Sequence, residues 1–480
     1  MQQHNAKQNP LPLGMGSIND DFKVVLVNPY HPEWGHGVPL GIAYLASTLE
    51  VGNIQVEVID MCAYGMNFTE LRETLKKCDA DIVGITATTP QIPIAFEIAK
   101  LVKEVFPNCK VAFGGVHPTS LPDEILSNPY VDFVVRGEGE VTLLELVSHL
   151  RFGGDINGIK GISHKMDERI IHNLPRPLIE NLDDLPYPAR HLFPFPDAYY
   201  SPMVKGKLFA DIFTSRGCTG KCIFCNHSVF GYKFRPRSAE NVLGEMEFLI
   251  NRYGVDEFHF ADDSFSYDIE RAIRICDMII SKKLNIAISC SGGLRVDCVT
   301  TELLDKLKRA GCYRIHFGVE SGSEEVLKKI GKKITLQQVR DAIAMAHEQG
   351  IITVALFMLG NYGENEQTMK ETIAFAKSLG ADFSQFTMAT PFPGSPFYRI
   401  LDKRGLLLTK DWSKYEIYKE PIFRTEYLDR NLIAKMYRKA YRQLYLNPSF
   451  IWGKLKTLKN LGDVKTALGG ACQIIRRAIW

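Results

Sequence analysis

The sequence has no apolar run of about 18 residues, the length at which a helix can span a membrane. Its first stretch, residues 1–21, is polar and carries proline and glycine, so it lacks the apolar core of a secretory signal. The 11 cysteines are odd in number and scattered along the chain, which argues against a disulfide framework. We therefore expect a cytoplasmic protein that begins with a flexible leader over residues 1–21.

Net charge is also small, at +2 for 480 residues, and the hydrophobic content of 45% is ordinary for a globular protein. The length allows two or three domains, each with its own core. The charge is uneven, however, because eleven lysines and arginines from Arg430 onward oppose a single acidic residue, Asp463. This asymmetry predicts that the tail contacts an anionic surface.

Short apolar strands alternate with helix-patterned segments over residues 22–152. The expected strands are Lys23–Asn28, Gln55–Asp60, Asp81–Thr86, Lys110–Gly114 and Val131–Arg136. The expected helices are Leu40–Val51, Thr69–Lys77, Ile92–Val105 and Val141–Leu150. Because the strands are almost wholly apolar, the pattern predicts an α/β domain with a doubly wound parallel sheet that is covered on both faces.

Ligands of such sheets bind beyond the carboxyl ends of the strands. Glycines there allow close backbone approach, and hydroxyl and amide groups can bind phosphate or amide groups of a ligand. The candidate ligand contacts at these ends are Thr86, Thr88, Gly114, Gly115, His117, Gly137 and Glu138. The fold alone predicts only a ligand of nucleotide size.

A proline-rich connection over residues 153–207 separates this domain from a second α/β region, and it contains a predicted hairpin, Gly161–Lys165 with Arg169–His172. Six strands follow over residues 208–400. They are Leu208–Phe213, Glu257–Ala261, Ala287–Ser291, Arg314–Val319, Thr353–Leu359 and Phe383–Met388. Six strand–helix units predict a partial (β/α)6 barrel with its active site at the carboxyl ends of the strands.

Three cysteines follow the first barrel strand at C-x3-C-x2-C spacing: Cys218, Cys222 and Cys225. Thiolates this close on one loop can converge on a metal centre, and soft sulfur ligands select iron–sulfur clusters or zinc. A closed zinc site normally needs four ligands, and His227 could supply the fourth. Without it, the trio suits a cubane cluster with one iron left open.

The cysteine spacing, with Phe224 before the last cysteine, closely resembles that of the radical S-adenosylmethionine (SAM) superfamily. The resemblance implies a 4Fe-4S cluster on Cys218, Cys222 and Cys225, whose open iron chelates SAM before SAM is cleaved to a 5′-deoxyadenosyl radical. Loops after later strands also resemble one large subfamily: Gly318–Ser323, Leu359–Glu364 and Thr390–Pro396. Within the second of these loops, Tyr362 stands where the subfamily has proline, so the shape of that loop is open.

The same resemblance implies SAM contacts at two other strand ends. Asp262 and Asp263 match positions near the SAM amino group, although two adjacent carboxylates could instead cap the helix that begins near Asp268. Glu320 and Ser321 match a motif that lies near the SAM ribose.

Residues 22–152 resemble the cobalamin-binding domain that precedes the radical SAM domain in this subfamily. The pieces that carry the resemblance are Val38–Ala46, Asp81–Ile85, Gly114–Pro118 and Val135–Glu140. The D-x-H-x-x-G motif that ligates cobalt in the methionine synthase type is missing, and Asp60–Gly65 imitates its spacing with Cys62 by coincidence. The resemblance therefore implies cobalamin without a protein ligand below the cobalt, with His36 and His117 as lower-face neighbours or packing residues.

Taken together, the resemblances imply a cobalamin-dependent radical SAM enzyme, and a methyltransferase in particular. An unactivated carbon is not nucleophilic enough to take the methyl group of SAM by displacement. Methylation of such a carbon therefore needs hydrogen abstraction and a methyl donor such as methylcobalamin. Two alternatives stay open: oxidation or ring closure with the same cofactors, and a non-catalytic cobalamin or metal sensor. An enzyme of this kind needs an external one-electron reductant of the flavodoxin or ferredoxin type.

The remaining residues, 401–480, read as a basic helical extension. The segment Leu428–Tyr445 is apolar on one side and basic on the other, and aromatic residues continue to Trp480. Such a segment can lie in a membrane interface at the inner face, or it can pack on the barrel. The first alternative motivates a lipid or isoprenoid substrate. No nucleic-acid motif accompanies the basic charge, so we expect no nucleic-acid partner.

Overall fold

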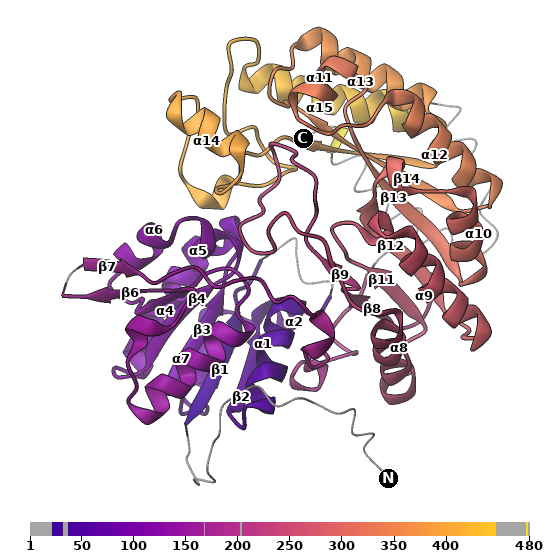
Figure 1. Cartoon of the computed structure of the whole chain (residues 1–480). Coiled ribbons are helices and arrows are strands. Elements are labelled where there is room, and N and C mark those ends of the chain that lie inside the picture. The colour runs from indigo at the N-terminus through magenta and orange to yellow at the C-terminus, as the bar shows by residue number, and fades with distance from the viewer. Residues whose placement is uncertain (1–21, 32–36, 168, 202–203, 448–476, 479–480) are drawn as a thin grey trace. The chain divides into compact units, whose positions relative to one another are not determined.

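The computed structural model describes residues 22–31, 37–167, 169–201, 204–447 and 477–478 (Figure 1). The chain divides into two compact units. The first unit comprises Met1–Ala87, Ile94–Ala198 and Arg235–Arg237, and the second comprises Thr88–Pro93, Tyr199–Phe234 and Ser238–Trp480. The predicted leader 1–21, His36 and most of the tail beyond residue 447 lie outside the described residues.

A seven-stranded sheet forms the centre of the first unit, in the order β2-β1-β3-β4-β5-β6-β7. Its strands are β1 (Lys23–Asn28), β2 (Gln55–Asp60), β3 (Ile82–Thr86), β4 (Lys110–Gly114), β5 (Phe133–Val135), β6 (Ile162–Met166) and β7 (Arg169–His172). The pairs among β1 to β5 are parallel, and β1 lies between β2 and β3. The strand order therefore reverses at β1 and β3, and their carboxyl ends form the crevice where doubly wound sheets bind ligands.

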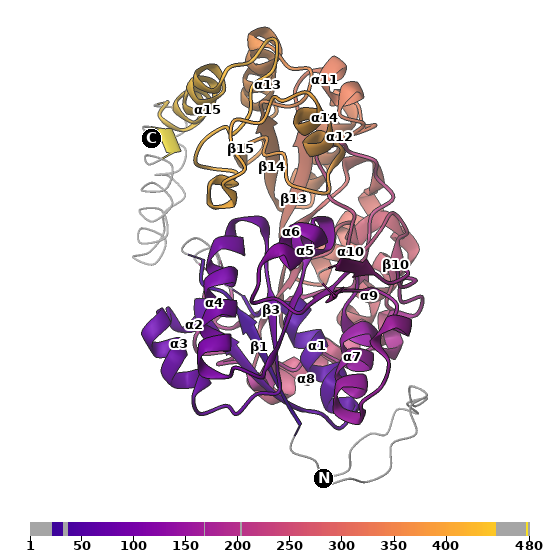
Figure 2. The ribbon, with the colours of Figure 1, turned by 90° about the vertical axis from the view of Figure 1, so that its left-hand side faces the viewer.

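Helices cover both faces of this sheet, as the sequence predicts. They are α1 (Leu40–Val51), α2 (Met61–Tyr64), α3 (Phe68–Leu75), α4 (Ile92–Val105), α5 (Val116–Ser120), α6 (Pro122–Ser127) and α7 (Glu140–Phe152). Figure 2 shows α2, α3 and α4 on one side of the strands and α1 and α7 on the other. Because both faces are covered, Val24, Val25 and Val27 on β1 are fully buried.

The predicted hairpin is present, but it is part of the sheet of the first unit. Strands β6 and β7 extend that sheet in antiparallel fashion from β5. In the loop after β5, the carboxylate of Glu138 lies 2.8 Å from Arg235 Nη1 and accepts the Ile179 N–H at 2.9 Å. Most of the stretch that the sequence analysis set apart as a linker, up to Ala198, therefore packs with the first unit.

The second unit contains a six-stranded sheet in the order β15-β14-β13-β12-β11-β8. Its strands are β8 (Phe209–Ile212), β11 (Glu257–Phe260), β12 (Ala287–Leu294), β13 (Cys312–Glu320), β14 (Ile352–Leu359) and β15 (Phe383–Met388). Every neighbouring pair is parallel. Strands β8 and β15 each have one neighbour, so the sheet is an open, partial barrel, and the predicted fold class is confirmed. Two short strands, β9 (Ser215–Arg216) and β10 (Arg235–Pro236), lie outside both sheets.

Helices follow the strands of the second unit. They are α8 (Ala239–Tyr253), α9 (Ile269–Ser281), α10 (Thr301–Arg309), α11 (Glu324–Lys329), α12 (Leu336–Glu348), α13 (Glu366–Ser378), α14 (Pro396–Lys403) and α15 (Arg430–Tyr445). Figure 1 shows α8, α9, α10 and α12 along the outer side of the strands. The loops at the carboxyl ends are therefore left to form the site.

Helix α15 covers the open edge at β15. The Tyr445 hydroxyl donates to the Ser384 carbonyl at 2.6 Å and accepts the Ser384 N–H at 2.8 Å. The Tyr441 hydroxyl makes the same pair of contacts with Phe386, at 3.1 and 3.3 Å. These bonds satisfy backbone groups that an edge strand would otherwise expose. Of the two alternatives for the basic extension, packing on the barrel is thus correct for α15, and the segment 448–476 lies outside the described residues.

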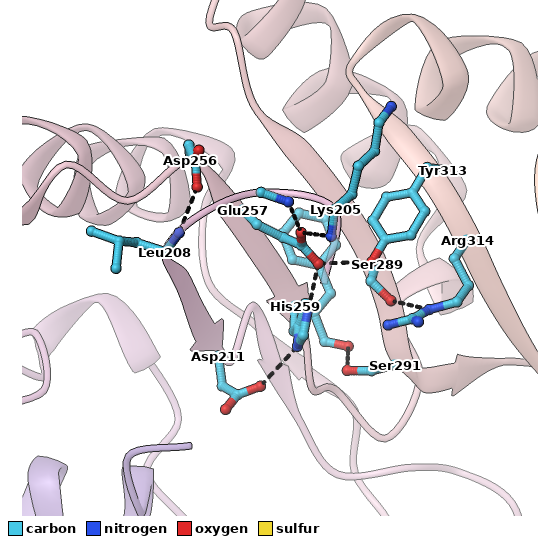
Figure 3. A network of polar contacts seen from close by, with 12 residues as sticks. Lys205, Leu208, Asp211, Asp256, Glu257, His259, Ser289, Ser291, Tyr313 and Arg314 are labelled. Carbon is cyan, nitrogen blue, oxygen red and sulfur yellow. Dashed lines mark hydrogen bonds and ion pairs between the residues drawn. The ribbon is translucent and has the colours of Figure 1, made fainter. Parts of the chain in front are cut away.

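A polar network holds the amino ends of the barrel strands together (Figure 3). Glu257, the first residue of β11, is fully buried and accepts the N–H groups of Lys205 and Gly206 at 2.6 Å each. His259 Nε2 donates to it at 2.7 Å, and the Tyr313 hydroxyl donates at 2.8 Å. This end of the sheet lies opposite the loops that carry the candidate site.

Among the helices of the described chain, none has both the length and the apolar character needed to cross a membrane.

Candidate functional site

The cysteine loop follows β8 and brings sulfur atoms together. Cys222 and Cys225 hydrogen-bond through their side chains, and the Cys225 N–H donates to the Cys222 carbonyl at 3.1 Å. A Cβ on Gly220 would lie 3.3 Å from Cys218 Sγ and 3.9 Å from Cys222 Sγ. The hydrogen bond from Cys225 lowers the pKa of Cys222 to about 7. Because the thiolate is the form that binds metal, Cys222 is prepared for ligation near neutral pH.

Asp262, at the carboxyl end of β11, anchors the start of this loop. Its side chain accepts the Thr214 N–H at 2.6 Å and the Ser215 hydroxyl at 2.7 Å, and Asp262 is 1% exposed. Burial raises the pKa of Asp262, although the charge of Arg271 opposes this effect. The carboxylate that the resemblance assigns to the SAM amino group is thus bonded to the cysteine loop.

Asp263 is exposed, in contrast to its neighbour, and it accepts the Gly217 N–H. Desolvation by the surrounding protein and the charge of Asp262 both raise the pKa of Asp263. The cap of α9 is Asp268, whose side chain accepts the Arg271 N–H at 3.0 Å. The alternative that Asp262 and Asp263 serve as that cap is therefore wrong, and a SAM contact at Asp263 stays a prediction.

The far side of the cysteine loop packs against the segment that follows α11. The Ile223 N–H donates to the Ile330 carbonyl at 3.0 Å, and the Phe397 N–H donates to the Ile223 carbonyl at 2.8 Å. A Cβ on Gly331 would lie 3.0 Å from the Lys221 carbonyl oxygen, so this position needs glycine for its close approach as well as for its φ of +72°.

Lys332, which the sequence analysis missed, forms a buried ion pair beside the cysteines. Its Nζ lies 2.8 Å from Glu320 Oε1, and the two side chains are 10% and 13% exposed. Glu320 has a φ of +71°, an uncommon value for a residue with a side chain. The Lys332 charge lowers the pKa of Cys222. The ion pair thus fixes Glu320, one of the predicted SAM contacts, close to the loop that would hold the cluster.

The neighbouring predicted contact, Ser321, is fully buried. Its hydroxyl lies 3.1 Å from Thr372 Oγ1 and accepts the Ser323 N–H at 3.2 Å. Ser321 therefore shapes the loop that carries Glu320, and a direct SAM contact at Ser321 stays a prediction.

Glu364 ends the predicted loop Leu359–Glu364 after β14 and is fully buried. Its Oε2 accepts the N–H groups of Gly360 and Asn361 at 2.7 and 2.8 Å. Burial raises the pKa of Glu364 to about 8, so the carboxyl group is protonated near neutral pH. Glu364 closes this loop although Tyr362 replaces the usual proline.

His227 does not complete a site for a single metal ion. Its Nδ1 lies 3.3 Å from the Gly231 carbonyl, and its ring stacks on Tyr232 with centroids 4.1 Å apart. In the described part of the chain, no three His, Cys, Asp or Glu side chains are placed to hold one ion. A 4Fe-4S cubane binds each thiolate at a different iron, so a loop of three cysteines fits it.

In the first unit, two of the predicted contact glycines have backbones that only glycine adopts readily. Gly115 has a φ of +102°, and a Cβ there would lie 3.1 Å from Thr86 Oγ1. Gly137 has a φ of +75° with open space around it, and its N–H donates to Thr119 Oγ1 at 3.1 Å. Gly115 in the loop after β4 and Gly137 in the loop after β5 thus leave the backbone without side chains where cobalamin would bind. Gly114, at the end of β4, does the same.

The other predicted cobalamin contacts have local roles. His117 is 1% exposed, and burial lowers its pKa to about 4, so it is neutral. The Thr88 hydroxyl lies 2.7 Å from Gln91 Oε1 at the start of a short turn. Glu138 is bonded to Arg235 and Ile179, as described above. Direct contacts of these residues with cobalamin stay predictions.

The imitation motif around Cys62 is a helix cap. Asp60 accepts the Cys62 N–H at 3.1 Å at the start of α2, and Cys62 Sγ lies 3.3 Å from the Pro29 carbonyl. Since β2 is the edge strand of the sheet, this cap supports the interpretation that the spacing is coincidental.

A doubly wound domain followed by an open six-stranded barrel whose first strand leads into three cysteines defines radical SAM enzymes with a cobalamin-binding domain. The model of the radical SAM superfamily matches residues 212–376, and the model of the B12 binding domain matches residues 35–147. The chain belongs to the family of cobalamin-dependent radical SAM methyltransferases, and its cofactors are a 4Fe-4S cluster, SAM and cobalamin.

Similar proteins support this assignment. The chain is 39% identical over 417 residues to a protein of Pyrococcus horikoshii described as an uncharacterized methyltransferase, with 86% of this chain and 89% of that protein covered. It is 28% identical over 441 residues to the anaerobic magnesium-protoporphyrin IX monomethyl ester cyclase of Rubrivivax gelatinosus, with coverages of 90% and 78%. The structure of OxsB with aqua-cobalamin and SAM bound has the same fold, with a TM-score of 0.75, 20% identity and coverages of 94% and 71%.

Replacing Gly217 with alanine is expected to reduce the iron and sulfide content of the reconstituted protein severely. Gly217 has a φ of +82°, and a Cβ there would lie 2.3 Å from the Lys233 carbonyl oxygen, so the cysteine loop would have to move. The control is Gly254→Ala, because Gly254 has a similar φ of +73° but nothing within 4 Å of a Cβ. Equal cluster contents in the two variants would contradict the prediction.

Proposed function

We propose that this enzyme transfers a methyl group to an unactivated carbon of a lipid or isoprenoid substrate. The observation that carries the methyl transfer is the 39% identity, over 89% of its length, to the methyltransferase of Pyrococcus horikoshii. The cofactors supply hydrogen-atom abstraction through a 5′-deoxyadenosyl radical and a methyl group through methylcobalamin.

Several residues of this chain contribute by holding the cofactors in place. Cys218, Cys222 and Cys225 offer thiolates on a loop that Asp262 fixes on one side. The Ile223–Ile330 backbone bond fixes the same loop on the other side. A loop held at both ends keeps its sulfurs in one geometry, which lowers the cost of ordering the site when the cluster binds.

The lipid substrate rests on the sequence of the extension. Its segment 448–476 has five basic residues and the aromatic residues Phe450 and Trp452, a composition that matches segments lying in an anionic membrane interface. Helix α15 uses its apolar side for packing on β15, and Arg477 packs over the Tyr418 ring at 4.0 Å, so membrane contact is proposed only for residues 448–476.

Oxidation or cyclisation is the second candidate, because the cyclase of Rubrivivax gelatinosus is 28% identical over 78% of its length. The two reactions leave different nucleoside products. Methyl transfer consumes one SAM to S-adenosylhomocysteine for each SAM that is cleaved to 5′-deoxyadenosine, whereas oxidation yields 5′-deoxyadenosine alone.

The deciding experiment is an anaerobic assay of the enzyme reconstituted with iron, sulfide and cobalamin, and supplied with SAM, dithionite and a host lipid extract. We expect S-adenosylhomocysteine and 5′-deoxyadenosine to rise together, in comparable amounts and only with the extract. 5′-Deoxyadenosine alone would establish the second candidate. A response to an aqueous extract but not to the lipid fraction would overturn the lipid substrate.

A further inference from the structure

A basic surface lies directly outside the cysteine loop. Three exposed lysines form it: Lys221 within the loop, Lys328 at the end of α11, and Lys333 two residues after Gly331. We refer to these three residues as the lysine face. No ion pair with a carboxylate is found for them among the described residues.

Backbone contacts place the lysine face against the cluster-binding loop. A Cβ built on Gly331 would lie 3.0 Å from the Lys221 carbonyl oxygen and 4.0 Å from the Cys222 Cα. Consecutive Cα atoms are about 3.8 Å apart, so the Cα of Lys333 lies within about 8 Å of that of Gly331. The lysines are therefore close to the sulfur ligands, yet their side chains face solvent.

The acidic residues around the lysine face are already engaged. Glu325 forms an ion pair with Lys329 at 2.5 Å, and Glu324 accepts the Leu336 N–H at 2.8 Å. Glu320 is paired with Lys332 inside the protein. The Leu336 N–H does not neutralise Glu324, but three lysines against this one carboxylate leave an excess of positive charge beside the cluster loop.

We propose that the lysine face is the docking surface for an acidic one-electron carrier protein. This proposal rests on the proposed function, because radical SAM chemistry takes one electron from outside for each SAM cleaved. Cleavage of one SAM to methionine and 5′-deoxyadenosine would take one electron from the carrier and one hydrogen atom from the substrate. The substrate radical would then take the methyl group from cobalamin, and a second carrier electron would be needed before another SAM can methylate the cobalamin again. Electron transfer between proteins weakens steeply with distance, so the carrier must dock near the cluster.

The chemistry of the face suits such a partner. Complexes between electron-transfer proteins bury small interfaces and form transiently, and opposite charges steer the two proteins together. Lysines on flexible stems that stay hydrated serve this purpose, since they attract the partner without requiring a fixed geometry.

The test uses the double variant Lys328→Glu/Lys333→Glu, which leaves Lys221 in the cysteine loop unchanged. The matched control is Lys377→Glu/Lys283→Glu. Lys377 also lies in the last turn of a helix, and Lys283, like Lys333, has a φ of +54°. Both control lysines are exposed and precede β15 and β12, at the opposite end of the sheet.

Two quantities are measured for the reconstituted enzymes: the affinity for an oxidised acidic flavodoxin by calorimetry, and 5′-deoxyadenosine formation with either reduced flavodoxin or dithionite. We expect the double variant to bind flavodoxin about tenfold more weakly and to lose the flavodoxin-driven rate in proportion. Its dithionite-driven rate and the behaviour of the control should match the wild type. Raising the salt concentration should weaken the wild-type complex.

Equal flavodoxin affinity in the double variant and the wild type would overturn the docking proposal, even if both cleave SAM. If the wild type binds flavodoxin through the lysine face but cleaves no SAM with dithionite and substrate, the proposed function fails instead. If the control variant loses the same affinity for flavodoxin as the double variant, binding depends only on the net charge of the enzyme and not on the lysine face. That result would also overturn the proposal.

Discussion

Cys222→Ala is expected to abolish 5′-deoxyadenosine formation and to leave the protein without its iron–sulfur cluster. Cys222 is 6% exposed and lies at the centre of the three-cysteine loop. The hydrogen bond from the Cys225 thiol lowers the pKa of Cys222 to about 7. Removing an outer-shell partner of a metal ligand already costs about 10- to 100-fold in affinity or activity. Removing one of three ligands should therefore take SAM cleavage to the limit of detection.

The measurements are iron and sulfide per chain after anaerobic reconstitution, and 5′-deoxyadenosine by mass spectrometry. Cys62→Ala is the control, because Cys62 is also a cysteine without a disulfide bond but lies after β2 in the first unit. This variant should keep the full cluster content. Wild-type 5′-deoxyadenosine formation by Cys222→Ala would refute the assignment of the cluster ligands.

Much of the fold could be predicted because its strands are short apolar runs bounded by polar residues. The predicted and observed bounds agree for β1, β4 and β15, for example at Phe383–Met388. Strands buried on both faces need apolar residues at nearly every position, so the pattern is strong in a single sequence. Where the apolar pattern is weaker, the observed ends of strands differ from the predicted ends. Strand β13, for example, is longer than predicted, at Cys312–Glu320.

The position of the β6–β7 hairpin and the role of α15 could not be predicted in the same way. Both depend on pairing between segments far apart in the sequence. The hydroxyl of Tyr441, for example, bonds to Phe386, 55 residues earlier. A tyrosine on an amphipathic helix gives no sign in the sequence that its hydroxyl will satisfy an edge strand.

In the candidate site, too, local features could be predicted from the sequence and contacts between distant segments could not. The cysteine spacing is local and could be recognised, and the three residues do lie on one loop. The partners that hold this loop are not local: Asp262 reaches Thr214 across 48 residues, and Lys332 reaches Glu320 only because the chain turns after α11. Nothing in the sequence indicated that Asp262 anchors the cysteine loop, and a SAM contact at Asp262 stays a prediction.

The largest effect on stability is expected at the other end of the barrel, for Glu257→Ala. Four donors converge on this carboxylate: two backbone N–H groups, His259 and the Tyr313 hydroxyl (Figure 3). The substitution removes the acceptor for all of them and leaves His259 paired only with Asp211, at 3.6 Å. Removing one partner of a buried ion pair costs about 3–5 kcal/mol.

The effect should be measured locally, because unfolding of a two-unit protein is not a single transition. Hydrogen exchange of peptides that span β8, β11 and β13 reports the local opening free energy of this sheet. We expect faster exchange there in Glu257→Ala and unchanged exchange in β1 and β3. Glu240→Gln is the control, since Glu240 pairs with Arg274 on the surface, and it should change exchange little.

The pH dependence follows from the same network. Burial opposes ionisation of Glu257, but the bonds from His259, Gly206 and Tyr313 outweigh it and lower the pKa of Glu257 to about 2. Its contribution to stability is therefore present above its ordinary pKa of about 4.3 and is lost as the pH falls toward 2.

The opposite sign holds for the histidine of the pair. Burial lowers the pKa of His259, but its bonds to Asp211 and Glu257 outweigh this effect, so the pKa is raised overall. Its contribution is complete below about pH 6.5 and is lost as the pH rises through the raised value. Protection of β11 in the wild type should therefore be greatest between about pH 4.3 and 6.5, and Glu257→Ala should flatten this profile. A variant profile with the same shape as that of the wild type would contradict the assigned network.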